Sequence, residues 1–320
     1  MSEHLIDVTV VEKTVLAEGI AGIELVATTG NALPPFSAGS HVDVYLGEGL
    51  LRQYSLWNDP SESHRYCLGV LCDDDGRGGS KAVHKLNVGD ALKISAPRNN
   101  FELDGGAAKS VLLAGGIGIT PILSMAQALH NQGADFTMHY CARNSERMAF
   151  QDLIAASDFA DKVQLHFDNG AVEQKFNMDA LSKSPDAGTH LYVCGPTGFM
   201  DAVLASAKDA WPAGALHREY FSVDANAVEG EDRAFQIQIS SSGDVLDVPA
   251  DKSIVEVLAD IGIEIPTSCE QGICGTCITP VLQGTPDHRD LVLTNEEHDD
   301  NDQMTLCCSR ALTELLVLDL

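Results

Sequence analysis

The chain lacks both a long hydrophobic segment and a basic leader. No run of eighteen apolar residues occurs in its 320 residues, so no stretch predicts a transmembrane helix. The start, Met1-Ser2-Glu3-His4, carries an acidic residue where a secretory or transit peptide carries basic ones. We therefore expect a cytoplasmic protein with no membrane partner.

Basic residues are also scarce. The chain has 20 Lys and Arg against 47 Asp and Glu, for a formal net charge of −27. Nucleic acid is excluded as a partner, because binding it requires positive charge. The 96 residues from Ala225 onward hold 19 acidic against 4 basic residues, a net charge of −15. This acidic surface either solvates the protein or attracts a basic partner protein, and the sequence leaves both open.

Hydrolytic motifs are missing as well. The chain has no HExxH motif and no evident catalytic triad, and its 11 histidines are scattered, so we interpret them as surface or structural residues. There is no internal repeat and no low-complexity tract. The length allows two or three domains, each with its own core.

The sequence does contain a distinctive group of cysteines. Three of them follow the pattern C-x4-C-x2-C, and a fourth comes thirty residues later: Cys269, Cys274, Cys277 and Cys307. This is the plant-type spacing for a [2Fe–2S] cluster. Gly272 and Gly275 let the loop curl round such a cluster with its N–H groups toward the sulfurs.

Other uses of these thiols are weaker interpretations. Structural zinc sites usually pair two C-x2-C knuckles, and only Cys274 and Cys277 have that spacing. Disulfides are disfavoured because a chain without a secretory signal is expected in a reducing compartment. Cys308 competes with Cys307 for the fourth position, and we choose Cys307 because it fits the ferredoxin spacing better.

The first 104 residues are predicted to form a β-barrel. Short β-rich runs are separated by turn residues, a spacing typical of a barrel. These runs are Ile6–Val11, Ile23–Val26, His41–Tyr45, Gln53–Trp57, Tyr66–Leu71 and Ala91–Ile94. One short helix is expected at Ser80–Leu86.

Two motifs in this barrel suit a flavin. In Arg52-Gln53-Tyr54-Ser55, strand alternation places Arg52 and Tyr54 on one face and Ser55 on the other. Arg52 then offers a cation for the phosphate, Tyr54 an aromatic ring for the isoalloxazine, and Ser55 a hydroxyl donor for its polar edge. Gly78-Gly79-Ser80 opens a helix N-terminus, which attracts phosphate.

Residues 105–224 are predicted to form an α/β nucleotide-binding domain with a parallel sheet. Apolar strands at Val111–Ala114, Thr137–Cys141, Val163–Phe167 and Leu191–Cys194 alternate with helical patterns. Two glycine turns follow strands: Gly115-Gly116-Ile117-Gly118-Ile119-Thr120-Pro121 and Cys194-Gly195-Pro196-Thr197-Gly198. The first departs from G-x-G-x-x-G, because Pro121 stands where the third glycine belongs. Together they indicate one nicotinamide crevice.

Residues 225–233 read as a linker, and residues 234–320 as a plant-type ferredoxin domain of the β-grasp kind. Strands are expected at Phe235–Ile239, Val245–Val248, Ile278–Leu282 and Leu315–Leu318. A capping box, Ser253-x-x-Glu256, predicts a helix, and Thr294-x-x-Glu297 predicts a short capped turn.

With these motifs in place, the whole chain resembles the phthalate dioxygenase reductase family, the reductase components of two-component Rieske oxygenases. The three blocks occur in the family's order. The motifs that carry the resemblance are Arg52-Gln53-Tyr54-Ser55-Leu56, Gly76-Arg77-Gly78-Gly79-Ser80, the two glycine turns, the cysteine loop and Asp287-His288-Arg289-Asp290.

The resemblance implies FMN rather than FAD, and NADH as the hydride donor. It places the flavin against Arg52, Tyr54, Ser55, Gly79, Ser80 and Thr120, with Phe221 lying against the ring. It places the nicotinamide at Gly116, Gly118, Cys194, Gly195 and Pro196. The preference for NADH over NADPH follows from the resemblance alone. Asp168 suits the ribose 2′-hydroxyl of NADH, whereas Arg143 suits the 2′-phosphate of NADPH, so the residues themselves leave the choice open.

The expected function is to pass electrons from NADH through FMN and the [2Fe–2S] cluster to a Rieske-type terminal oxygenase, with the reductase acting as a monomer. Hydride transfer by positioned cofactors needs no catalytic acid or base from the protein. Two alternatives stay open. One is an FAD-dependent reductase serving a monooxygenase or a hybrid-cluster protein, and the other is a non-catalytic [2Fe–2S] carrier or sensor.

Overall fold

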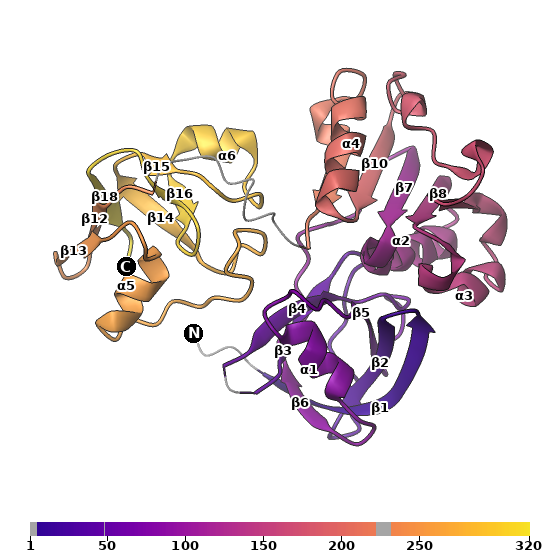
Figure 1. Ribbon diagram of the computed structural model, residues 1–320, viewed down its shortest axis with the longest axis horizontal. Coiled ribbons are helices and arrows are strands. Elements are labelled where there is room, and N and C mark those ends of the chain that lie inside the picture. The colour runs from indigo at the N-terminus through magenta and orange to yellow at the C-terminus, as the bar shows by residue number, and fades with distance from the viewer. Residues whose placement is uncertain (1–4, 48, 222–231) are drawn as a thin grey trace. The chain divides into compact units, whose positions relative to one another are not determined.

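The computed structural model describes residues 5–47, 49–221 and 232–320 (Figure 1). The chain divides into two compact units, with the boundary between Phe221 and Ser222. Of the predicted linker, Ala225–Arg233, only Asp232 and Arg233 lie within the described residues.

The first unit begins with a six-stranded antiparallel sheet, drawn in indigo and purple in Figure 1. Its strands are β1 (Ile6–Ala17), β2 (Ile20–Ala27), β3 (His41–Tyr45), β4 (Leu51–Ser55), β5 (Tyr66–Leu71) and β6 (Ala91–Ile94), in the order β4-β3-β6-β1-β2-β5. A bridge between Leu56 and Leu68 joins the two edge strands. The sheet therefore closes as a barrel, with helix α1 (Gly79–Lys85) after β5.

The sequence predicted the fourth strand at Gln53–Trp57, and in the structure this strand begins and ends two residues earlier, at Leu51–Ser55. The pairing of β4 with β3 ends at Ser55 opposite His41. Leu56 then bridges to Leu68, and Trp57 N donates to the Cys67 carbonyl at 3.1 Å. The chain turns toward β5 here because closing the barrel requires a second partner at this point.

The same unit also holds a five-stranded parallel sheet. Its strands are β7 (Lys109–Gly115), β8 (Phe136–Ala142), β9 (Val163–Phe167), β10 (Thr189–Cys194) and β11 (Leu216–Glu219), in the order β11-β10-β7-β8-β9. The helices between them are α2 (Ile119–Asn131), α3 (Gln151–Ala155) and α4 (Thr197–Ala207). Short 3-10 segments are η1 (Gly116–Gly118), η2 (Ser145–Arg147), η3 (Ala160–Lys162), η4 (Val172–Gln174), η5 (Met178–Ala180) and η6 (Ala213–Ala215).

One hydrophobic core joins the two sheets of this unit. Ile20 and Phe101 from the barrel side pack in the same buried cluster as Leu112 of β7 and Ile122 of α2. Gln127 of α2 also donates to the Trp57 carbonyl at 2.7 Å. The two sheets are therefore held together by packing, which is what a site shared between them requires.

The second unit contains a mixed five-stranded sheet. Its strands are β12 (Phe235–Ile239), β13 (Val245–Val248), β14 (Ile278–Gln283), β16 (Gln303–Thr305) and β18 (Leu315–Leu318), in the order β13-β12-β18-β14-β16. A two-stranded ribbon pairs β15 (Pro286–Asp287) with β17 (Arg310–Ala311).

Two short helices of this unit begin with the predicted capping boxes. At α5 (Ile254–Asp260), Glu256 N donates to Ser253 Oγ at 3.2 Å and Ser253 N donates back to Glu256 Oε2 at 2.7 Å. Thr294 and Glu297 repeat this arrangement at α6 (Asn295–Asp300). The reciprocal bonds satisfy backbone donors that a helix start otherwise leaves unpaired.

The predicted fold class is confirmed: an antiparallel flavin-type barrel, a parallel α/β sheet and a ferredoxin-like sheet occur in one chain. Within the described ranges, no helix combines the length and the apolar character needed to cross a bilayer.

Candidate flavin, nicotinamide and iron-sulfur sites

The two flavin motifs of the barrel lie in direct contact. Arg52 of β4 donates through Nη2 to the Arg77 carbonyl at 2.9 Å. Gly79 lies against the Arg52 side chain so closely that an added Cβ would come within 3.0 Å of Arg52 Nε. Gly78, with φ of 85°, makes the left-handed turn that opens α1. The Arg52 guanidinium and the N-terminus of α1 thus lie next to each other, and their N–H donors fit a phosphate group.

The other predicted flavin residues have defined surroundings. Tyr54 is half-buried, and burial raises the pKa of its phenol to about 12. Thr120 is buried and donates to the Ile117 carbonyl at 3.1 Å. Ser80 Oγ accepts a hydrogen bond from Asp73 N at 3.0 Å. Phe221, at the end of the first unit, keeps 37% of its surface exposed.

Ser55 marks the point where the barrel meets the parallel sheet. Its hydroxyl donates to Glu219 Oε2 at 3.4 Å, across 164 residues of sequence. Glu219 ends β11 and lies opposite Cys194 of β10 in the parallel register. Burial raises the pKa of the Glu219 carboxyl to about 8, although the residue as a whole is only partly buried. Burial and the nearby Glu219 raise the pKa of the fully buried Cys194 thiol.

Glu219 is expected to make the stability of the first unit depend on pH. Because its pKa rises from 4.5 to about 8 on folding, the folded state keeps a proton that the unfolded state loses as pH rises through this window. Stability therefore falls with rising pH. Between about pH 6 and pH 8, we expect the free energy of unfolding of wild type to fall by roughly 1 to 2 kcal/mol more than that of Glu219→Gln. This is less than a fully buried carboxyl would give, because Glu219 is partly exposed.

The measurement is denaturant unfolding at both pH values, followed by tryptophan fluorescence. Both tryptophans, Trp57 and Trp211, lie in the first unit, so the signal reports on that unit. Equal pH dependence in wild type and Glu219→Gln would refute the assignment of the raised pKa.

The two glycine turns lie against each other at the carboxyl ends of β7 and β10. A Cβ on Gly118 would lie 2.6 Å from Gly195 N and would overlap the Cys194 carbonyl. A Cβ on Gly195 would lie 3.0 Å from Gly115 Cα. Gly116 has φ of 52°, a left-handed value that favours glycine. Only glycines allow this approach, and the resulting cradle at the carboxyl edge of the sheet fits a dinucleotide.

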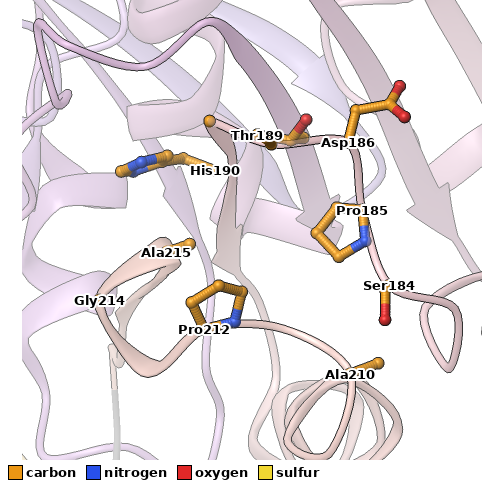
Figure 2. A pocket seen from close by; sticks show the side chains of 11 residues that line it. Ser184, Pro185, Asp186, Thr189, His190, Ala210, Pro212, Gly214 and Ala215 are labelled. Carbon is orange, nitrogen blue, oxygen red and sulfur yellow. The ribbon is translucent and has the colours of Figure 1, made fainter.

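A separate pocket of about 310 Å³ lies at the opposite edge of this sheet. Figure 2 shows the Ser184 to Asp186 segment on one side and the Pro212 to Ala215 segment on the other. Thr189, the first residue of β10, also lines it. Because ligands of open parallel sheets gather at the carboxyl ends of the strands, this pocket is not the nicotinamide crevice.

In the second unit the cysteine loop gathers its thiols closely. Hydrogen bonds from the Cys274 and Cys307 thiols lower the pKa of Cys269. Cys307 likewise lowers the pKa of Cys277 by a hydrogen bond. The backbone N–H groups of Gln271 and Ile273 both donate to Cys269 Sγ at 3.4 Å. Four converging sulfurs with backbone donors fit an iron-sulfur cluster.

The two candidates for the fourth ligand face different neighbours. Cys307 contacts Cys269 and Cys277, whereas the Cys308 thiol lies 3.2 Å from the Thr305 hydroxyl. A Cβ on Gly272 would lie 2.5 Å from Cys308 Sγ, so Cys308 packs behind the loop. This arrangement favours Cys307 over Cys308.

Glu219 is the functional candidate that sequence reasoning missed. The sequence analysis singled out Phe221 but not Glu219, because β11, Leu216–Glu219, is a short strand with little apolar pattern. An acidic residue at the end of the short strand that pairs with β10 was the available signal. Its buried carboxyl became evident only through the contact with Ser55.

Comparison with known proteins agrees with this arrangement. A model described as the 2Fe-2S iron-sulfur cluster binding domain matches residues 237–312. A model described as dimethylamine monooxygenase subunit DmmA-like, N-terminal domain, matches residues 92–215.

Full-length relatives are also found. The vanillate O-demethylase oxidoreductase of Pseudomonas sp. (strain HR199 / DSM 7063) is 54% identical over 318 residues, 99% of this chain and 100% of that protein. A structure of phthalate dioxygenase reductase is 39% identical, with a TM-score of 0.75, covering 99% of this chain and 98% of that one. An intact type IV self-sufficient cytochrome P450 monooxygenase is 37% identical, with a TM-score of 0.88, and this chain spans 41% of it.

The fold and these matches define an oxidoreductase that carries a flavin and a [2Fe–2S] cluster. The chain belongs to the phthalate dioxygenase reductase family. Members of this family are reductase components that transfer electrons from NAD(P)H through flavin to [2Fe–2S]. The predicted family and cluster are confirmed, and the zinc interpretation of the cysteine loop is wrong.

Proposed function

We propose that the chain takes electrons from NADH through FMN to its [2Fe–2S] cluster and delivers them to a Rieske-type terminal oxygenase of a two-component system. We further propose that this oxygenase demethylates a methoxylated aromatic acid such as vanillate, and that the reductase works as a cytoplasmic monomer. The strongest support is that one chain carries both a hydride-accepting unit and a one-electron unit. Identity of 54% to a vanillate O-demethylase oxidoreductase supports the substrate class.

In this proposal Arg52 and the α1 N-terminus bind the flavin phosphate. Gly78, Gly79 and Ser80 form the turn around it, while Tyr54, Ser55 and Thr120 orient the flavin and Phe221 covers its ring. FMN rather than FAD is the flavin that the family resemblance implies, and Arg52, whose side chain lies against Gly79, would give its phosphate a cationic partner.

The nicotinamide would lie in the cradle of the two glycine turns, at Gly116, Gly118, Cys194, Gly195 and Pro196. Cys269, Cys274, Cys277 and Cys307 would hold the cluster. The bound flavin would supply two-electron hydride chemistry and the cluster one-electron chemistry. The protein's own part is to hold the reacting groups in position and to exclude water.

The flavin and the hydride donor provide the test. Flavin released from the purified protein should have the mass of FMN, and NADH should reduce cytochrome c through the protein at least about ten times more efficiently than NADPH, a difference of about 1.4 kcal/mol. Extracted FAD would contradict the flavin assignment. Absence of NADH-dependent reduction would favour a non-catalytic carrier.

The partner is tested separately with a purified vanillate oxygenase component. NADH oxidation should then be coupled to formaldehyde release from vanillate, and replacing the oxygenase by a phthalate oxygenase should weaken the coupling. Equal coupling to both would remove the support for a methoxylated substrate.

A further inference from the structure

The motif Asp287-His288-Arg289-Asp290 has no part in the proposed electron path, yet it builds a compact polar group. His288 and Asp290 lie beside His298 of α6, and one ligand atom from each lies within 4.8 Å of the others. His298 Nε2 is 3.2 Å from Asp290 Oδ2, and His288 Nδ1 is 3.7 Å from Asp290 Oδ1. Ligand atoms around a tetrahedral zinc ion are separated by about 3.3 Å, given bonds of about 2.0 Å.

His288 is the unusual member of this group. Only 9% of its side chain is exposed, and neither ring nitrogen has a hydrogen-bond partner within the described residues. Its nearest charged neighbour, Asp290 Oδ1, is beyond hydrogen-bond distance at 3.7 Å. A buried polar atom without a partner is costly. A ligand between His288 and Asp290 would remove that cost.

Asp290 is held in place by its surroundings. Its side chain is fully buried, with Leu293 N donating to Oδ2 at 2.9 Å and Ser309 Oγ donating to Oδ1 at 3.4 Å. Such outer bonds orient a ligating carboxylate and commonly accompany metal sites. The oxygens can still accept a cation, since each carboxylate oxygen offers more than one lone pair.

The two histidine rings lie face to face. Their centroids are 4.3 Å apart with an interplanar angle of 20°, so packing brings both imidazoles to the same side of Asp290.

We propose that His288, Asp290 and His298 form a binding site for a divalent transition-metal ion, with zinc as the probe and water completing the coordination. Two imidazoles and one carboxylate are a donor set that zinc and similar ions accept. The proposal is independent of the electron path and does not involve the four cluster cysteines.

The site also supports the loop that holds those cysteines. Leu291 N donates to the Gly272 carbonyl at 2.9 Å, and a Cβ on Gly272 would lie 2.8 Å from Asp290 Cα. Fixing Asp290 therefore fixes the back of the cysteine loop. A bound ion should accordingly slow the loss of the cluster.

Elemental analysis of the holoprotein provides the test. After mild chelation and dialysis against limiting zinc, wild type should hold one zinc ion in addition to an unchanged iron content. His298→Gln should weaken zinc binding at least about tenfold, measured by competition with a chromogenic chelator. The matched control, His64→Gln, replaces an exposed histidine of the first unit and should bind zinc as wild type does.

A second variant, His288→Gln, should lose zinc to a similar extent, so the result does not depend on one substitution. Cluster loss under a strong iron chelator should be several times slower with zinc present, in wild type and His64→Gln only. The proposal is overturned if wild type binds no zinc, if both site variants bind it like wild type, or if zinc enters only as iron is lost.

Discussion

Replacing Cys274 by serine is expected to abolish the [2Fe–2S] cluster and all electron delivery beyond the flavin, while NADH still bleaches the flavin. Cys274 is 5% exposed and its thiol lies against that of Cys269, so its sulfur belongs to the converging group. A serine hydroxyl is a poor ligand for this cluster, because thiolates are the preferred ligands. The flavin should be unaffected because its candidate residues belong to the other compact unit.

Iron and sulfide content, and the electron paramagnetic resonance signal of the reduced protein, measure the cluster. Stopped-flow absorbance measures flavin reduction. We expect at least about a hundredfold loss of cytochrome c reduction, or about 2.7 kcal/mol in transition-state terms. Loss of flavin reduction in the same variant would contradict the independence of the two units.

Cys308→Ser is the matched control for this experiment. Its thiol faces the hydroxyls of Thr305 and Ser309, which a serine hydroxyl can also meet, so the cluster should assemble normally. If Cys308→Ser lost the cluster while Cys307→Ser retained it, the fourth ligand would have to be reassigned to Cys308.

The second large effect is expected from Gly118→Ala, which should disrupt the nicotinamide cradle. The added methyl group would meet the backbone of Cys194 and Gly195, with Gly195 N at 2.6 Å, and neither can rotate away as a side chain could. The two turns must separate. We expect a loss of stability of about 1 to 3 kcal/mol in the first unit and at least about a tenfold weaker interaction with NADH.

Denaturant unfolding followed by tryptophan fluorescence, together with the KM for NADH, measures both effects. Gly105→Ala is the control, because that exposed glycine has nothing within 4 Å of an added Cβ and should change stability by less than about 0.5 kcal/mol. The cluster spectrum should stay normal in both variants. A Gly118→Ala protein with unchanged stability and KM would contradict the close approach of the turns.

Much of the fold could be predicted because its signals are local. Alternating burial along β12, with Phe235, Ile237 and Ile239 inward, follows from the two-residue repeat of a strand. Both capping boxes were predicted from residues three positions apart, and both form. The cysteine spacing predicted the cluster for the same reason, since three of the four thiols lie within nine consecutive residues.

Features that depend on distant residues could not be predicted in this way. Strand β4 ends at Ser55 because the barrel closes through Leu68, and no local pattern carries that information. The histidines were interpreted as scattered surface or structural residues. Three-dimensional packing brings His288 and His298 into stacking contact.

The sequence by itself determined the order of the modules, the cluster type and the kinds of residue available to each cofactor, because spacing and periodicity belong to consecutive residues. Only the tertiary structure decided that Ser55 meets Glu219 across 164 positions and that Asp290 lies behind the cysteine loop. Burial, raised pKa values and close backbone contacts depend on which distant segments pack together. That packing is a property of the whole folded unit.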